Sequence, residues 1–318
     1  MRDKVSRNYA VAICFLFDNC FPNFVAIYFS TFMKKIVLGL CIFSSAFVWS
    51  CKEIGPAVDL SPITAKDTTY IGIVEASTPR KVLVEECTGV KCVNCPDGAA
   101  VLKTIEEANP NNLIVIGIHT GFLTSPIDGA SQYNFQSQAA SDLMSFFSES
   151  PSKPAAAIDR IKEAGSYFMD KGIWQQKISN RFSVPTKENI TITSSFDTTS
   201  RQAIIKVRVA YTSDISDHQN LMVGLIENDI IDAQEFPSSI DTFYHHNHVL
   251  RSFLTPASGS AVLDSLSTKF AGRVYERTFI YTVNSAWNSS NCKIFAYLFK
   301  NESGQDYEVA QAAMIPLK

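Results

Sequence analysis

The chain has 318 residues, with 28 basic and 31 acidic side chains, so its formal net charge is −3 at neutral pH. A nucleic-acid-binding surface would be basic, so this charge balance argues against a nucleic-acid partner. Hydrophobic residues make up 46% of the chain, which is enough for one or two packed cores.

The first fifty residues have the pattern of a targeting sequence. Residues 1–32 are rich in aromatic side chains and precede a second methionine, so we interpret them as an over-extended start. A short basic segment then leads into the apolar run Ile36–Val48, which is too short to span a bilayer. The small residue Ser50 precedes Cys51, as in a lipobox. We therefore predict a lipoprotein signal peptide over residues 33–50 and a mature protein held to a membrane by lipid on Cys51, with ordinary secretion as the alternative.

Residues 51–80 are polar and contain three prolines, which predicts a tether between the lipid and the folded part. A short strand is expected at Tyr70–Val74. Export would bring the chain into an oxidising compartment, so a close pair of cysteines is interpreted as a disulfide or a redox site.

The segment 81–185 alternates between strand and helix patterns. Lys81–Glu86 is rich in β-formers, Pro96–Ala108 has helical spacing, and Leu113–His119 is an apolar run typical of a strand buried on both faces. These three elements predict a β-α-β unit. Further on, the pattern predicts a helix near Gln136–Phe147, a strand at Ala155–Asp159 and a helix around Tyr167–Phe182.

The segment 186–318 has a different pattern, with short strands separated by stretches rich in Ser, Asn, Asp and Gly. This rhythm, without helical spacing, is typical of an antiparallel β-sandwich. The expected strands are Ile190–Phe196, Ala203–Tyr211, Leu221–Glu227, Arg273–Val283, Lys293–Phe299 and Tyr307–Ile315.

The motif Cys92-Val93-Asn94-Cys95-Pro96 lies where the first predicted helix begins. The helix dipole and its free N–H groups stabilise a thiolate there, and a proline suits the first helical turn. If the pair is redox active, we expect Cys92 to be the more exposed, attacking thiol and Cys95 the resolving thiol. A purely structural disulfide is the alternative, and zinc is disfavoured because no second ligand pair follows. Cys87 and Cys292 are expected to be buried apolar side chains.

Three histidines are further candidates. His119 ends a predicted strand at the sheet edge where the cysteine motif lies, so it would handle protons near the motif or cap the strand by a hydrogen bond. His246 and His248 would share one face of a strand and are weak candidates for a metal site. No third ligand is evident, so a loop or interface role is favoured, and no cofactor is expected.

The order of strand, Cys-x-x-Cys-Pro, helix, apolar strand and late proline resembles the thioredoxin-like fold. This resemblance implies an α/β thioredoxin-like domain over residues 81–185, followed by an all-β, immunoglobulin-like sandwich over residues 186–318. It also implies that Pro154, with Pro151 as the rival, is a cis-proline beside the disulfide that shapes a peptide groove. Val93-Asn94 replaces the Gly-Pro of thioredoxin, so no redox potential is carried over.

A second resemblance is to the Omp28-related family, outer-membrane lipoproteins of Bacteroidota named for a 28-kDa protein. The run from Glu85 to Gly89 leading into the cysteine motif is similar to that family, as are His119 with Gly121 and the segment Asn247–Arg251. Cys87 departs from the pattern by replacing an aromatic residue. The resemblance implies an outer-membrane protein but no settled activity.

Two functions follow from these expectations. In the first, the protein is a lipid-anchored thiol–disulfide oxidoreductase of the envelope, with Cys92, Cys95, Pro154 and His119 at its site. In the second, it is a non-catalytic binding or assembly lipoprotein whose disulfide is structural. The expected partners are the membrane, through lipid on Cys51, and either an envelope protein or a thiol substrate.

Overall fold

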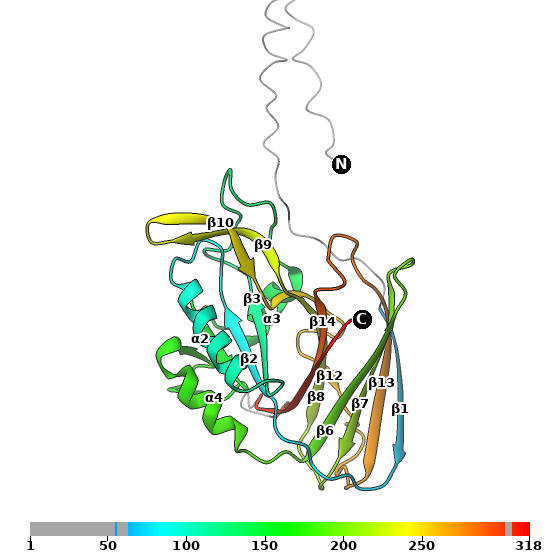
Figure 1. Cartoon of the computed structure of the whole chain (residues 1–318). Coiled ribbons are helices and arrows are strands. Elements are labelled where there is room, and N and C mark those ends of the chain that lie inside the picture. Colours follow the sequence, from blue (N-terminus) through cyan, green and yellow to red (C-terminus); the bar gives the residue numbers. More distant parts are fainter. Residues whose placement is uncertain (1–54, 56–62, 303–306) are drawn as a thin grey trace, which may run out of the picture. The chain divides into compact units, whose positions relative to one another are not determined.

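Three β-sheets organise the described part of the chain, which comprises residues 55, 63–302 and 307–318 of the computed structural model (Figure 1). The predicted over-extended start, the signal peptide and the lipid-bearing Cys51 lie outside these residues. Across the described helices, none is both long and apolar enough to pass through a membrane.

The largest sheet has nine strands and joins segments from both halves of the chain. Its order is β15-β14-β8-β11-β3-β2-β4-β5, with β12 paired to β8. β2 and β3 run parallel, as the β-α-β pattern predicts, and β11 runs parallel to β3 and antiparallel to β8. The strands are β2 (Val82–Cys87), β3 (Leu113–Ile118), β4 (Ala155–Ile158), β5 (Phe168–Asp170), β8 (Gln219–Glu227), β11 (Val249–Phe253), β12 (Ser260–Ala261), β14 (Cys292–Lys300) and β15 (Val309–Pro316).

A second sheet has four antiparallel strands in the order β1-β13-β7-β6. They are β1 (Thr64–Ile71), β6 (Glu188–Phe196), β7 (Gln202–Tyr211) and β13 (Arg273–Thr282). Burial alternates along β7, so one face of this sheet is buried and the other is exposed. The buried face forms a core with β8 and β14 of the large sheet, which includes Tyr211, Leu225, Phe279 and Ile294.

The helices cover the other half of the large sheet. α2 (Cys95–Ala108) and α4 (Trp174–Phe182), which follows the short helix η1 (Lys171–Ile173), share a core with one face of β2, β3 and β4. α3 (Gln138–Phe147) packs on the opposite face. Both faces of β2 and β3 are therefore covered, which is why all six residues of each strand are buried.

The third sheet is a hairpin of β9 (Ile230–Phe236) and β10 (Ser239–His246), which projects beyond the end of β3 near the start of α2 (Figure 1). The hairpin is joined to the large sheet through β11. Gly117 of β3 donates its backbone N–H to the carbonyl oxygen of His248 at 2.7 Å. A Cβ atom at Gly117 would lie 3.2 Å from that oxygen, so the glycine allows this close approach.

The predicted fold class, an α/β thioredoxin-like domain followed by a separate immunoglobulin-like sandwich, is wrong. Strands account for 43% and helices for 14% of the described chain, which is mostly β-sheet. The segment 81–185 does not have a sheet of its own. Its strands belong to a larger sheet that also contains β8, β11, β14 and β15 from the later part of the chain. The helices α2 and α3 and most strands were predicted correctly within a few residues. The helix expected over residues 167–182 begins only at Trp174, because β5 and η1 occupy residues 168–173, and β1 covers Thr64–Ile71 rather than Tyr70–Val74. The strands β5, β9, β10, β11 and β12 were missed.

Candidate functional site

The predicted pairing of Cys92 and Cys95 is confirmed, since the two residues form a disulfide. α2 begins at Cys95 with Pro96 in its first turn, and the preceding Asn94 makes no side-chain cap. The N–H groups of the first turn therefore have no side-chain cap from Asn94, while the N–H of Cys95 donates to the carbonyl oxygen of Cys92 at 3.0 Å. The expectation that Cys92 is the more exposed cysteine is wrong, because each cysteine is only 2% exposed. The residues between them, Val93 and Asn94, are exposed instead.

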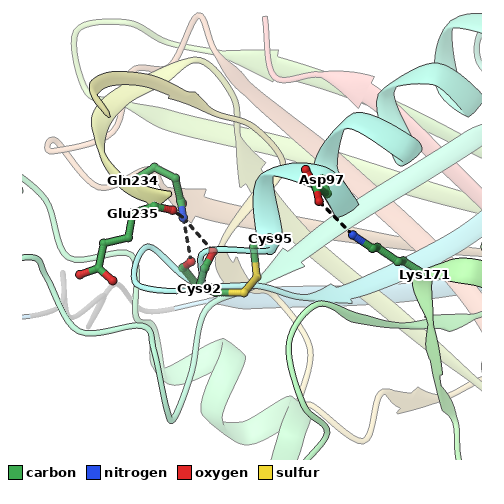
Figure 2. Close-up of a disulfide and its surroundings, with 7 residues drawn as sticks. Cys92, Cys95, Asp97, Lys171, Gln234 and Glu235 are labelled. Atoms are coloured by element: carbon green, nitrogen blue, oxygen red, sulfur yellow. Dashed lines mark hydrogen bonds and ion pairs between the residues drawn. A yellow bond between two sulfur atoms is a disulfide. The ribbon is translucent and has the colours of Figure 1, made fainter. Parts of the chain in front are cut away.

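The β9–β10 hairpin covers the loop that carries Cys92. Figure 2 shows Gln234 of β9 reaching toward this loop, where its Nε2 donates to the carbonyl oxygens of Cys92 at 3.1 Å and Gly89 at 3.4 Å. The backbone N–H of Glu235 donates to the carbonyl of Val90 at 2.8 Å. The hairpin was not predicted from the sequence, and it explains why Cys92 is shielded from solvent.

A buried carboxyl group, Glu86 of β2, lies beneath the first turn of α2. A Cβ atom placed on Gly98, one turn after Cys95, would lie 3.2 Å from Glu86 Oε1. Glu86 is 5% exposed, and Oε1 has no hydrogen-bond partner. Burial raises the pKa of Glu86 to about 8, so the carboxyl is mostly protonated at neutral pH.

Sequence reasoning did not select Glu86, although a signal was present. Side chains alternate across a strand, so Glu86 shares a face with Val82 and Val84, which belong to the core under α2 and α4. An acidic residue in that row loses its contact with water when the core forms, and this loss is costly unless the carboxyl group has a hydrogen-bonding or charged partner. Its position at the end of the strand feeding the cysteine motif made it a candidate.

Pro154 precedes β4 and follows a cis peptide bond from Lys153, whereas no cis bond is found at Pro151. A Cβ atom on Gly98 would lie 3.0 Å from Pro154 Cβ. Pro154 therefore packs against the same turn of α2 that covers Glu86. Its assignment as a site residue stays a prediction.

His119 follows β3 and is 3% exposed. Glu86 pairs in register with Gly117, two residues before His119, so Glu86 and His119 lie on the same face of the sheet. Burial, and then the neighbouring His246, lower the pKa of His119 to about 3. The ring is therefore neutral at physiological pH, which does not favour the proton-handling role. Its Nδ1 has no hydrogen-bond partner.

The other two histidines do not share a strand face as the sequence suggested. β10 ends at His246, and His248 has a positive φ of 60° beyond it. The His246 ring packs 4.6 Å from Phe135 and 4.8 Å from Tyr244, while His248 Nε2 lies 3.5 Å from Glu106 Oε2. In the described part of the chain, no cluster of three or more His, Cys, Asp or Glu residues could hold a metal ion.

A cleft of about 860 Å³ begins at the disulfide and continues along α2. One wall is α2, the other is the inner face of the β9–β10 hairpin, and Glu86, Thr88 and His119 form its floor. Glu86 and Tyr244 both line this cleft, and burial, followed by the charge of Glu86, raises the pKa of Tyr244. The two walls come from segments more than a hundred residues apart.

The two remaining described cysteines, Cys87 and Cys292, are buried and free, as predicted. Burial raises the pKa of each thiol to about 12. Neither forms an appreciable thiolate at neutral pH, so neither is a third redox partner in this structure.

Comparisons with known proteins identify a family and one similar fold. The family model described as outer membrane protein Omp28 matches residues 145–316, a range that begins after the disulfide. Among solved structures, HBP35 of Porphyromonas gingivalis is similar with 14% identity and a TM-score of 0.60, over 76% of this chain and 77% of that chain. A structural genomics target from Agrobacterium tumefaciens has 11% identity and a TM-score of 0.47, over 76% of this chain and 97% of that chain, and carries no argument. No curated protein matches the chain.

Proposed function

Since this chain belongs to the outer membrane protein Omp28 family, we propose that it acts in the cell envelope as a lipid-anchored thiol–disulfide oxidoreductase whose redox pair is Cys92 and Cys95. The family supports the envelope location. The lipid on Cys51 and the redox activity are proposals, because the family match does not include either site.

The buried Glu86 carboxyl, whose Oε1 has no partner beneath the first turn of α2, carries the redox proposal. A buried polar group without a partner lowers stability, and a purely structural disulfide would gain nothing from one. A protonated carboxyl under the first turn of α2 is useful when the disulfide opens, because the departing sulfur needs a proton. Acids with raised pKa values beside a reactive group are typical of sites that transfer protons.

The proposed reaction starts from the oxidised pair. A substrate thiolate attacks Cys92 Sγ, the bond between the two sulfurs breaks, and Cys95 leaves as a thiolate that takes the proton of Glu86. Cys92 is now in a mixed disulfide with the substrate. A second thiolate of the substrate then attacks the substrate sulfur of that bond and releases Cys92 as a thiolate. Two electrons pass from the substrate dithiol to the protein, and the reverse sequence reduces a substrate disulfide.

A redox titration of the disulfide against glutathione tests this proposal. We expect a reduction potential above about −300 mV, the value below which disulfides are generally structural. Once the pair is reduced, the attacking thiol of the proposed reaction, Cys92, should react with iodoacetamide faster than Cys95, because attack on a disulfide requires a thiolate, and α2 lowers the pKa of a thiol held at its N-terminus. A potential below that limit, together with slow alkylation of both thiols, would refute the proposal.

The variant Glu86→Gln provides a second measurement. It keeps the shape of the side chain but cannot donate a carboxyl proton, so dithiothreitol should reduce the disulfide more slowly. When the rate is divided by the concentration of dithiothreitol thiolate, its remaining dependence on pH near 8 should be present in the wild type and absent in Glu86→Gln. The matched control is Glu163→Gln, an exposed glutamate that does not line the cleft beside the disulfide, and it should react like the wild type.

The second candidate function, a binding lipoprotein with a structural disulfide, is favoured by one observation. Both cysteines are almost fully buried, and Gln234 of the hairpin covers Cys92. In that case, the double substitution Cys92→Ser and Cys95→Ser would lower stability without loss of cellular function. For either function, Cys51→Ser should abolish lipid attachment and release the protein from the membrane fraction.

A further inference from the structure

The cleft extends well beyond the disulfide. Its lining begins at Cys95 and Pro96 and continues to Pro110 and Asn111, just past the end of α2. α2 has 14 residues, so the cleft is about 21 Å long at 1.5 Å per residue. A single small thiol would contact only the end near the disulfide.

The two walls differ in chemistry. The wall formed by α2 contains the small side chains Ala99 and Ala100, which leave room above the helix. The hairpin wall presents the aromatic rings of Phe236 and Tyr244, whose centroids are 6.1 Å apart. These two rings meet at 66°, and an aromatic wall of this kind opposite small side chains accommodates a chain with apolar side groups.

The rim carries both signs of charge. Three acidic side chains, Asp97, Glu106 and Glu107, and two basic ones, Lys103 and Lys293, line the cleft. This balance gives no strong field of one sign, so it does not favour a phosphate or another multiply charged ligand.

The floor offers neutral polar atoms without partners. His119 is 3% exposed, its Nδ1 has no hydrogen-bond partner, and the ring lines the cleft. A buried polar atom without a partner is best satisfied by a ligand or by water. A peptide group supplies both a donor and an acceptor without charge, and so matches a neutral ring nitrogen.

We propose that the cleft between α2 and the β9–β10 hairpin binds an extended polypeptide segment, with its cysteine at the disulfide. A strand rises about 3.3 Å per residue, so about six residues span the cleft. The placement of the substrate cysteine at the disulfide rests on the proposed function. The binding of an extended polypeptide segment in the cleft does not depend on it. The substrate is then an unfolded or extended region of a protein rather than a small thiol.

The test places a bulky side chain in the cleft without touching the core. Ala100 lines the cleft on an exposed position of α2, and Ala108 is exposed on the same helix outside the cleft, so Ala100→Trp is the test variant and Ala108→Trp is its matched control. The rate of mixed-disulfide formation is measured for each protein with glutathione, and separately with a neutral ten-residue peptide that has one central cysteine flanked by valine and phenylalanine.

We expect Ala100→Trp to lower the ratio of the peptide rate to the glutathione rate by about tenfold, because the indole fills the space of the peptide. Ala108→Trp should leave the ratio at the wild-type value. An unchanged ratio in Ala100→Trp, or an equal loss in the control, would overturn the proposal.

Failure of the proposed function gives a different result. If the wild-type disulfide reacts with neither glutathione nor the peptide, the oxidoreductase proposal is wrong. The peptide with serine in place of its cysteine then decides the cleft proposal alone, by fluorescence anisotropy. Binding to the wild type and the control, but not to Ala100→Trp, supports the cleft as a polypeptide site, and no binding to the wild type refutes it.

Discussion

Replacing Glu86 by glutamine isolates the ionisation of one buried carboxyl group, because the two side chains have nearly the same shape. Burial raises the pKa of Glu86 from 4.5 to about 8. At pH values between 4.5 and about 8, the Glu86 carboxyl has lost its proton in the unfolded chain and retains it in the native protein. The native state binds more protons, so the free energy of unfolding falls as pH rises, by about 1.4 kcal/mol per unit.

From about pH 5 to pH 7, the ionisation of Glu86 lowers the free energy of unfolding of the wild type by roughly 2.5 kcal/mol. The glutamine of Glu86→Gln does not ionise, so it makes no such contribution. His119 has the opposite slope, since burial lowers its pKa to about 3, but it is present in both proteins and cancels in their difference. We therefore expect the stability of Glu86→Gln relative to the wild type to increase by that amount over this range.

Urea denaturation of both oxidised proteins at several pH values measures this difference. The slopes with denaturant should be equal in the two proteins, so that the midpoints report stability alone. A difference that does not vary with pH would show that Glu86 is ionised or hydrated in the native state. The physical reason for assigning it as the proton donor to Cys95 would then be lost.

Three further outcomes are expected from other parts of the structure. Gln234→Ala removes two hydrogen bonds to the loop that carries Cys92. Dithiothreitol should therefore reduce the disulfide several-fold faster, as measured by a quenched alkylation assay. An unchanged rate would mean that the hairpin does not limit access to the disulfide. Glu85→Ala leaves the buried Arg160 without its ion-pair partner. The free energy of unfolding, measured in urea, should fall by about 3–5 kcal/mol. A loss under about 1 kcal/mol would contradict the burial of this pair. Burial raises the pKa of the Cys87 and Cys292 thiols to about 12. Both should therefore resist iodoacetamide at about pH 8 in the native protein and react with it after unfolding. Labelling of the folded protein would contradict their burial.

The local pattern of the sequence was sufficient to predict the disulfide motif and the elements next to it. The spacing of Cys92 and Cys95 predicts a disulfide, because two intervening residues allow the sulfurs to meet at the start of a helix. The apolar run of β3 and the helical spacing of α2 likewise depend on neighbours within a few residues, and the structure confirms both. The signal peptide and Cys51 lie outside the described residues, so their assignment stays a prediction.

Tertiary structure decided the fold class and the surroundings of the motif. β11 joins the helical segment to the later strands by pairing with β3 and β8, and no local pattern specifies which strand becomes the neighbour of another. The contact of Gln234 with the Cys92 loop joins residues 142 positions apart. Glu86 is visible in the sequence, but its raised pKa depends on burial beneath α2 after the sheet and helix pack together. Spacing along the chain therefore determined the disulfide pair, whereas long-range strand pairing and burial determined its exposure and the raised pKa of the carboxyl group near it.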